Sequence, residues 1–168
     1  MARYSYAVNS VTPTATADTT NLVDSTYLGY LQGGNSTMRL NISEVYMGGE
    51  AASSSSPTVI LLGRSSTVGT GTATGGFSAV LDGSNTAPGT VARVGNACAT
   101  TKPQRSSTLG HLLTLSFNAY GGIVRWVARP GEEISVVGNT ASLGEATLSA
   151  FTGGTPGAMS AHVLYEVA

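Results

Sequence analysis

The chain has 168 residues, of which 10% are charged and about a quarter are Ser or Thr, and its net charge is −1. This length fits one domain with a core of its own. The near-neutral charge excludes the basic surface that nucleic-acid binding requires, so we expect no nucleic-acid partner. The single cysteine, Cys98, excludes an intrachain disulfide and a cysteine-rich metal cluster.

The sequence carries no targeting or membrane signal. Its N-terminal segment lacks the apolar core of a secretory signal, and no run approaches the roughly 18 apolar residues of a membrane span. We therefore expect synthesis in the cytoplasm and no membrane partner. A surface rich in hydroxyl groups and poor in charge favours a subunit packed among its own copies, because free monomers usually keep surface charge for solubility. The alternative is a low-charge monomer.

Short strands separated by turn residues are expected along the whole chain. The 22 Gly and 6 Pro residues are spread so evenly that few windows could hold a long helix. Ten segments have the alternating or continuous apolar pattern of strands. In chain order they are 4–8, 38–47, 57–63, 77–81, 91–94, 113–119, 123–128, 133–138, 145–151 and 162–167.

Three local features refine these strands. The apolar alternation within residues 38–47 changes phase, which predicts a β-bulge near residues 43–44. The Gly-Gly pair at 121–122 predicts a turn between two strands. The Pro-Gly pair at 130–131 predicts another turn, which would make the strands on either side of it a hairpin.

Regular short strands of this kind favour an all-β fold, specifically an antiparallel β-sandwich of jelly-roll-like type. No loop is long enough to link two folded units, so we expect a single sandwich domain over residues 36–168. Residues 1–35 are expected to form an extended N-terminal arm together with the first strand.

No catalytic, cofactor or metal site is expected. A serine nucleophile needs a positioned His and an orienting acid, but no G-x-S-x-G elbow occurs and His111 and His162 are the only histidines. No H-x-H or H-E-x-x-H pair is present, so a cupin-type metal site lacks its ligands. Glu132 and Glu133 are adjacent on an expected strand and point to opposite faces, which excludes a glycosidase pair.

Charged and aromatic residues concentrate in residues 117–138, which hold the only Trp of the chain. The candidate interface residues in this segment are Arg125, Trp126, Arg129, Glu132 and Glu133. The arginines and glutamates flank the expected Pro-Gly turn, so ion pairs across strands or between subunits are predicted. We interpret the segment as a core hairpin whose charged end faces a neighbouring subunit.

Four blocks of the sequence resemble a family of small structural proteins from tailed phages and viral metagenomes. The blocks are "MRLNISEVYMGGEA" (38–51), "TTKPQRSSTL" (100–109), "LSFNAYGGIVRWVARPGEEI" (115–134) and "SLGEATLSAFTGGTPGAMSAHVLYE" (142–166). Together they cover a little under half of the chain. The resemblance implies a virion structural protein of the capsid-decoration type, and it supplies no catalytic residues.

The leading hypothesis is a capsid decoration (cement) protein, made in the host cytoplasm and located in the virion. It would bind the major capsid protein and itself, as a homo-oligomer such as a trimer, without a cofactor. Added buried surface between capsomers would stabilise the shell by mass action. The segment from Ala2 to about Val23 would be the docking arm, with Tyr4 and Tyr6 as aromatic anchors and backbone pairing by β-augmentation.

Two other functions remain open. A receptor- or glycan-binding module of a tail or fibre would use exposed Tyr27, Tyr30 and Tyr46 to stack on sugars, although such tyrosines are often core residues. A hydrolase would use a serine with His111 or His162, but it would need a third partner for which the sequence has no signature.

Overall fold

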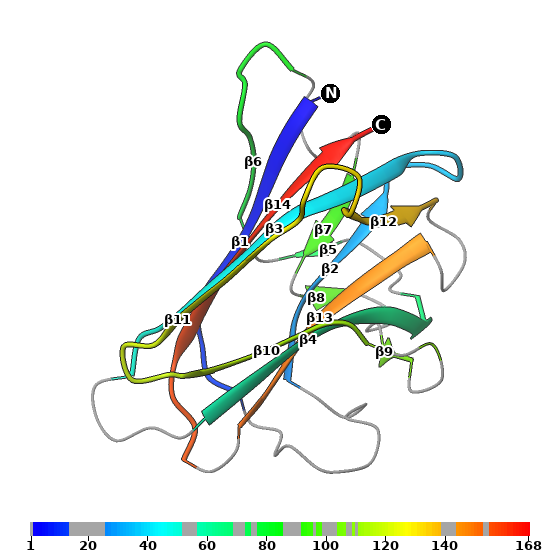
Figure 1. Cartoon of the computed structure of the whole chain (residues 1–168). Coiled ribbons are helices and arrows are strands. Elements are labelled where there is room, and N and C mark those ends of the chain that lie inside the picture. The colour runs from blue at the N-terminus through cyan, green and yellow to red at the C-terminus, as the bar shows by residue number, and fades with distance from the viewer. Residues whose placement is uncertain are drawn as a thin grey trace.

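The computed structural model is an all-β structure (Figure 1). It describes residues 2–13, 26–51, 57–68, 73–74, 77–85, 92–95, 97–98, 104–106, 109, 111–138, 144–152 and 155–168. The backbone alone is described for 26–28, 57, 60–61, 73–74, 77–78, 92–95, 97–98 and 104–105. No α-helix occurs among these residues, so the all-β prediction is confirmed.

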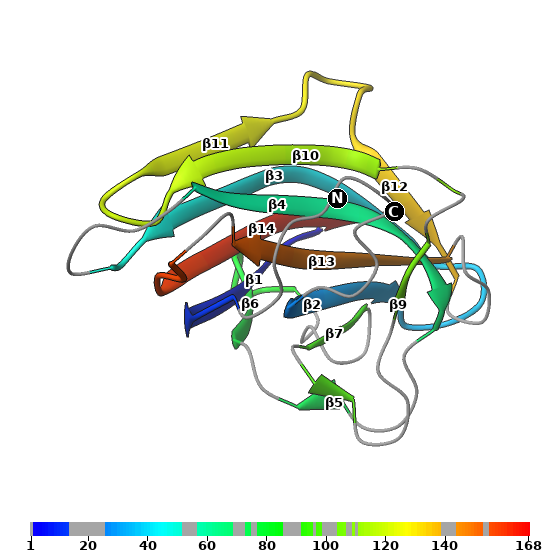
Figure 2. The same cartoon turned by 90° about the horizontal axis from the view of Figure 1, so that it is seen from below.

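In the part of the chain that the structure describes, fourteen strands form two six-stranded sheets and one two-stranded sheet, all antiparallel. Sheet A contains β1 (Ala2–Val11), β3 (Arg39–Gly49), β6 (Phe77–Val80), β11 (Ile123–Val127), β12 (Ile134–Val137) and β14 (Met159–Val167). Sheet B contains β2 (Thr26–Gly33), β4 (Pro57–Thr67), β7 (Ala92–Gly95), β9 (Gln104–Arg105), β10 (His111–Asn118) and β13 (Glu145–Thr152). The small sheet contains β5 (Ala73–Thr74) and β8 (Ala97–Cys98). The two large sheets face each other (Figure 2), so the predicted antiparallel β-sandwich is confirmed.

Strand pairing follows a nested order along the chain. The first and last strands, β1 and β14, are neighbours in sheet A, and the two termini lie side by side (Figure 1). In sheet B, β2 pairs with β13. In sheet A, β3 pairs with β11 and β12, and in sheet B, β4 pairs with β10. The chain therefore folds back on itself as one long ribbon whose successive strand pairs alternate between the two sheets.

The predicted bulge in β3 is present at Ser43. Leu164 of β14 lies opposite Glu44, and the next residue, Tyr165, lies opposite Ile42, which leaves Ser43 as the extra residue. The bulge shifts the alternation, so that buried positions continue on the inner side both before and after it. The change of phase in the sequence was thus a correct signal of local geometry.

The predicted hairpin around the Pro-Gly pair is wrong. Both β11 and β12 pair with β3 and run in the same direction along it, so they are two parts of one edge strand. The Ser43 bulge lies opposite the gap between them, and the Ala128 N–H donates to the Ser43 carbonyl at 2.9 Å. A turn does form, with Glu132 N–H donating to the Arg129 carbonyl and Gly131 at φ 85°. It closes a loop that leaves and rejoins the edge, and it does not reverse the chain.

The Gly-Gly pair makes a corner between the sheets. It joins β10, at the edge of sheet B, to β11, at the edge of sheet A, and these strands run close together (Figures 1 and 2). Gly121 has φ 67°, a conformation that favours glycine. A side chain at Gly122 would collide with the carbonyl oxygen of Asn118, and one at Gly49 with that of Ala119. Glycine at these places lets the two sheet edges approach closely.

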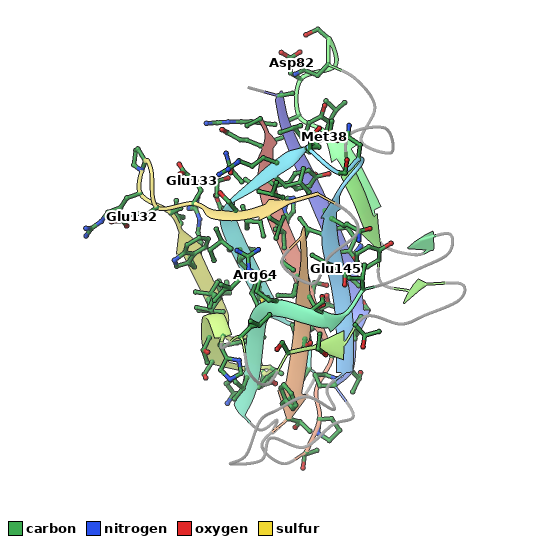
Figure 3. The ribbon with its side chains drawn as sticks, turned by 90° about the vertical axis from the view of Figure 1, so that its right-hand side faces the viewer. Met38, Arg64, Asp82, Glu132, Glu133 and Glu145 are labelled. Atoms are coloured by element: carbon green, nitrogen blue, oxygen red, sulfur yellow. The ribbon has the colours of Figure 1, made fainter. Side chains whose placement is uncertain are left out.

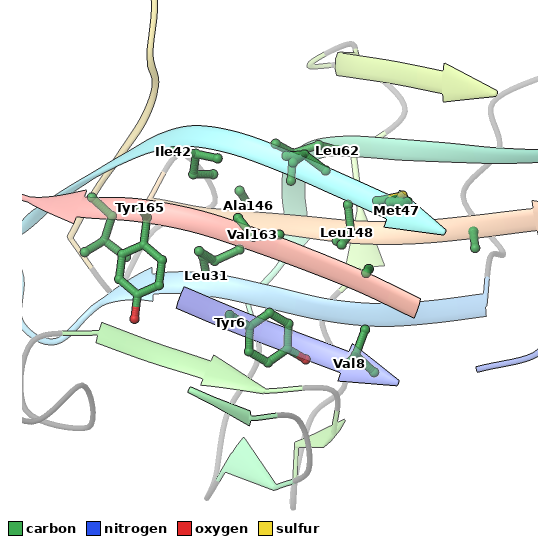
Figure 4. Close-up of a cluster of buried hydrophobic side chains, with 14 of the residues drawn as sticks. Tyr6, Val8, Leu31, Ile42, Met47, Leu62, Ala146, Leu148, Val163 and Tyr165 are labelled. Atoms are coloured by element: carbon green, nitrogen blue, oxygen red, sulfur yellow. The ribbon is translucent and has the colours of Figure 1, made fainter. Parts of the chain in front are cut away.

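The hydrophobic core fills the space between the two sheets (Figure 4). Its labelled members are Tyr6, Val8, Leu31, Ile42, Met47, Leu62, Ala146, Leu148, Val163 and Tyr165. The rings of Tyr4 and Tyr165 stack with centroids 5.5 Å apart, and the Tyr6 ring packs against the backbone of Gly29 in the opposite sheet. Burial, assisted by Tyr30, raises the pKa of Tyr6, so this phenol stays neutral.

The first strand corrects the prediction of a docking arm. β1 lies between β14 and β6 and pairs with both of them. Tyr4 and Tyr6 are each 1% exposed, so no partner can reach them while the sandwich is folded, and their assignment as interface anchors is wrong. Strands on both sides of the predicted boundary at residue 35 belong to the same two sheets. The remainder of the predicted arm, residues 14–25, lies outside the described residues.

Candidate functional site

The outward side of sheet A is exposed, and we call it the open face. It consists of the outward-pointing residues of β1, β3, β11, β12 and β14 and of Leu81, which follows β6. Tyr46 lies opposite Arg125 on one side and His162 on the other, and directly opposed residues of antiparallel strands share a face. The same register carries this face from the edge strand to β1.

Exposed apolar side chains gather on the open face. Among the described residues seven large hydrophobic side chains are exposed, and five belong to this face: Tyr46 (38%), Leu81 (52%), Ile123 (66%), Val127 (53%) and Val137 (44%). Tyr46 and Ile123 line a hollow at one end of the face, and Leu81 and Val127 line a hollow at the other. The open face is therefore the candidate contact surface of the molecule.

Two hollows lie on the open face. The Leu81 hollow, of about 380 Å³, is lined by Leu81, Val127 and Leu164 together with charged residues. The Tyr46 hollow, of about 360 Å³, is lined among others by Tyr46, Gly48 and His162 at the end near the Gly-Gly corner. The two hollows have no lining residue in common, so they can be altered separately.

Ion pairs compensate much of the charge on the open face. Arg125 binds Glu44 with two hydrogen bonds, Nε to Oε1 at 2.7 Å and Nη2 to Oε2 at 3.0 Å. Arg3 Nε lies 2.7 Å from Glu166 Oε1. Because the arginines are largely exposed, solvent screens both pairs and they contribute little to stability. Their main effect is to leave a nearly neutral surface.

The predicted interface residues of the 117–138 segment have separate positions. Arg125 is on the open face, but it pairs with Glu44 of β3 and not with Glu132 or Glu133. Trp126 points the other way and packs against the core. It is half-buried on the edge strand, and its assignment as an interface residue stays a prediction.

The loop between β11 and β12 carries the other three predicted interface residues. Arg129 and Glu132 are exposed, and Glu133 is half-buried, where its Oε1 accepts a hydrogen bond from Gly131 N–H at 3.1 Å. The loop projects beyond the edge strand, as Figure 3 shows at Glu132. These residues remain available for a subunit contact, which stays a prediction.

The Tyr46 hollow contains an oriented carboxylate that the sequence did not reveal. Glu50 Oε2 accepts a hydrogen bond from Ser10 Oγ at 2.6 Å, and its Oε1 accepts one from Ser160 Oγ. These bonds lower the pKa of Glu50. The three residues are far apart in the chain and meet only because β1, β3 and β14 end together, so no local pattern could have predicted the cluster.

The outer side of sheet B differs from the open face along β13, because every residue of that strand is buried. Glu145 and Thr147 each lie 2.6 Å from Ser65 Oγ, which donates to Glu145 Oε1. At the same end of the sandwich, Arg64 Nη2 donates to the Ser135 carbonyl at 2.7 Å and so ties sheet B to sheet A (Figure 3). Burial lowers the pKa of Arg64. Ser65, Glu145 and Thr147 are buried and so are not accessible to a partner, whereas Arg64 is half-buried.

The histidines and tyrosines considered for other functions have clear positions. His111 and His162 are both exposed, on different sheets. The hydroxyl of Ser160, which shares the Tyr46 hollow with His162, donates to Glu50 and not to a histidine, so the hydrogen bond to a histidine that the hydrolase hypothesis needs is not the one made by this serine. Tyr30 is fully buried, so its predicted role in stacking on sugars is wrong; Tyr46 is partly exposed, and the Tyr27 side chain lies outside the described residues.

Among the residues that the structure describes, no three His, Cys, Asp or Glu side chains are grouped to hold a metal ion. Within the same residues we find no helix with the length and apolar character needed to cross a membrane. A scan against protein-family models and a search of curated proteins gave no match for the chain.

Proposed function

We propose that the chain is a virion structural protein, a capsid decoration subunit that binds the major capsid protein and other copies of itself, as a homotrimer. The observation that carries this proposal is the exposed apolar surface around the Leu81 hollow. The phage-like blocks of the sequence support the viral assignment, and the low content of charged residues, 10%, supports an assembled state.

We also infer that the sandwich is a jelly roll. The nested pairing of first with last strand, second with second-last and so on, alternating between sheets, is what a rolled-up antiparallel ribbon of eight main strands would give. Jelly rolls are frequent in viral shell proteins. This connectivity is compatible with the proposed function, although fold alone does not establish it.

The Leu81 end of the open face is suited to docking. Leu81, which follows β6, and Val127 of β11 line the same hollow with the half-buried Leu164. The Arg3–Glu166 pair and Glu44 line the same hollow between them, so a partner would meet apolar and polar groups side by side, as protein interfaces present both. Covering such a surface in the shell would contribute stability by removing apolar area from water.

The test is incorporation into particles. The full chain is co-expressed with the major capsid protein of the phage that carries its gene, and the purified particles are imaged by electron cryomicroscopy. Wild-type protein should occupy regular positions on the shell. Leu81→Glu and Val127→Glu should each lower occupancy at limiting protein about tenfold or more, because a charge would be buried at a docking surface.

Ser116→Glu is the matched control, because Ser116 is exposed on β10 of the other sheet. It should incorporate as the wild type does. Absence of wild-type protein from particles would overturn the proposed function. Normal occupancy of both the Leu81 and Val127 variants would overturn docking through this end. Sedimentation of the free protein as a monomer would overturn the trimer.

A further inference from the structure

We propose that the Tyr46 hollow is a binding site for a neutral sugar ring of hexose size. This inference goes beyond the proposed role in the shell and uses the opposite end of the open face. A volume of about 360 Å³ lies at the small end of ligand pockets, about 300–1,000 Å³. A single sugar ring has an apolar face and a rim of hydroxyl groups, and the hollow offers partners for both.

The hollow exists because residue 48 has no side chain. Tyr46, Gly48 and Glu50 are two residues apart in an outward-pointing row at the end of β3, so the first and last are about 13 Å apart along the strand. A Cβ built on Gly48 would meet no atom within 4 Å. The space between the aromatic ring and the carboxylate is therefore open to a ligand.

The carboxylate at the far side of this space is held in place by an unusual piece of backbone. Ser10 has φ 53°, the one positive value among the non-glycine residues that the structure describes, and it lies in the β1 bulge between Val8 and Val11. Bulges re-aim side chains, and residues held in such strained conformations cluster at ligand sites. Here the bulge directs the Ser10 hydroxyl to Glu50.

Glu50 retains hydrogen-bonding capacity after these contacts. Each carboxylate oxygen accepts one serine hydroxyl, while an ionised carboxylate has about four acceptor positions. The Glu50 N–H donates to the Ala158 carbonyl at 2.8 Å, which fixes the backbone at this point. The Ser10 backbone N–H also acts on the carboxylate, so at least one acceptor position is left for a hydroxyl donor of a ligand.

The remaining lining selects the class of ligand. Ala7 and Ile123 are apolar, Asn9 and His162 can donate or accept hydrogen bonds, and the lining contains no Lys or Arg. A carboxylate without a neighbouring cation disfavours phosphate or carboxylate ligands. An aromatic side chain with an apolar face and a wet edge suits an amphipathic ring. A neutral polyhydroxylated ring meets these conditions together.

The experiment uses the isolated full chain and a panel of methyl glycosides of neutral and N-acetylated hexoses. Binding is detected by saturation-transfer NMR, and affinity is measured by titration of ¹⁵N-labelled protein. For a shallow one-ring site we expect a Kd on the order of 1 mM for at least one glycoside. Gly48→Leu, which fills the hollow, and Tyr46→Ala should each weaken binding about tenfold or more.

The matched control is Ser116→Leu, which adds the same side chain to the exposed surface of β10. It should bind the glycoside as the wild type does. Absence of binding across the panel, undiminished binding by Gly48→Leu, or binding of Nα-acetyl-lysine methyl ester in place of every sugar would overturn the inference. Particle incorporation is measured separately with the Leu81 and Val127 variants, so failure here leaves the proposed shell function standing.

Discussion

Outward side chains are exposed on sheet A but buried along β13 of sheet B. On the open face of sheet A, outward residues such as Ile123 and Val127 are more than half exposed. On sheet B, the outward residues of β13 are buried, among them Phe151 and Glu145. β13 lies between β2 and β4, and β14 of sheet A lies between β1 and β3, yet the outward residue His162 of β14 is exposed. Pairing on both sides therefore does not by itself bury an outward side chain. An outward residue that the rest of the chain covers contributes to stability. An outward residue that stays exposed is available for contact with a partner.

The largest expected effect is on the free energy of unfolding, when one large side chain is truncated on β13 and one on the open face. Phe151 is 1% exposed on the outward side of β13, and Phe151→Ala should lower the free energy of unfolding by about 3–5 kcal/mol. Ile123→Ala on the open face should lower it by less than about 1 kcal/mol, because the side chain is already in water. Urea unfolding of both variants measures the difference. Equal losses would show that the open face is packed against something in the isolated chain.

A smaller effect is expected when a methyl group is added. A Cβ at Gly29 would lie 2.5 Å from Cε1 of the Tyr6 ring, which crosses the sandwich at that point. Gly29→Ala should therefore lower the free energy of unfolding by about 1–3 kcal/mol. Gly48→Ala, which adds the same methyl where nothing lies within 4 Å, should be neutral or slightly stabilising. Urea unfolding again decides, and a neutral Gly29→Ala would contradict the close packing of Tyr6.

Alternation in the sequence predicted the strands well because it reports which residues share a side. The pattern within 113–119 gave the inward side of β10, and the phase change gave the bulge at Ser43. The apolar pattern of β11 also indicates that apolar residues are exposed on the open face. Ile123 and Val127 alternate with Val124 and Trp126, so one of the two apolar sets must face outward.

Long-range pairing could not be obtained from local pattern. The Pro-Gly turn was correctly recognised as a turn, but only the partner strand decides whether a turn makes a hairpin or a loop in one edge strand. Tyr4 and Tyr6 were assigned to a docking arm because nothing local distinguishes a terminal strand that enters a sheet from one that stays free. The Ser10, Ser160 and Glu50 cluster likewise depends on three strand ends meeting.

The smallest expected effect tests that cluster through its pH dependence. Hydrogen bonds from Ser10 and Ser160 hold the pKa of Glu50 below its ordinary value in the folded chain. A carboxyl group with a lowered folded pKa contributes stability above its unfolded pKa and loses it as the pH falls through the folded one. Wild-type protein should thus lose a small increment of stability below about pH 4.3 that Glu50→Gln does not lose. Because Glu50 is exposed, solvent screening should keep the increment under about 0.5 kcal/mol.

Ser160→Ala separates this effect from a general change in charge. Ser160→Ala keeps the carboxylate and removes one hydrogen-bond donor, so it should remove part of the stability loss at acid pH. The double variant with Glu50→Gln should show the same pH dependence of stability as Glu50→Gln alone. Urea unfolding between pH 3 and 7 measures these curves. Parallel curves for wild type and Glu50→Gln would mean that the serines do not hold the carboxylate in solution. The Tyr46 hollow would then lack the fixed carboxylate that accepts a hydrogen bond from a sugar hydroxyl. Its apolar lining alone would be left to contact a ligand.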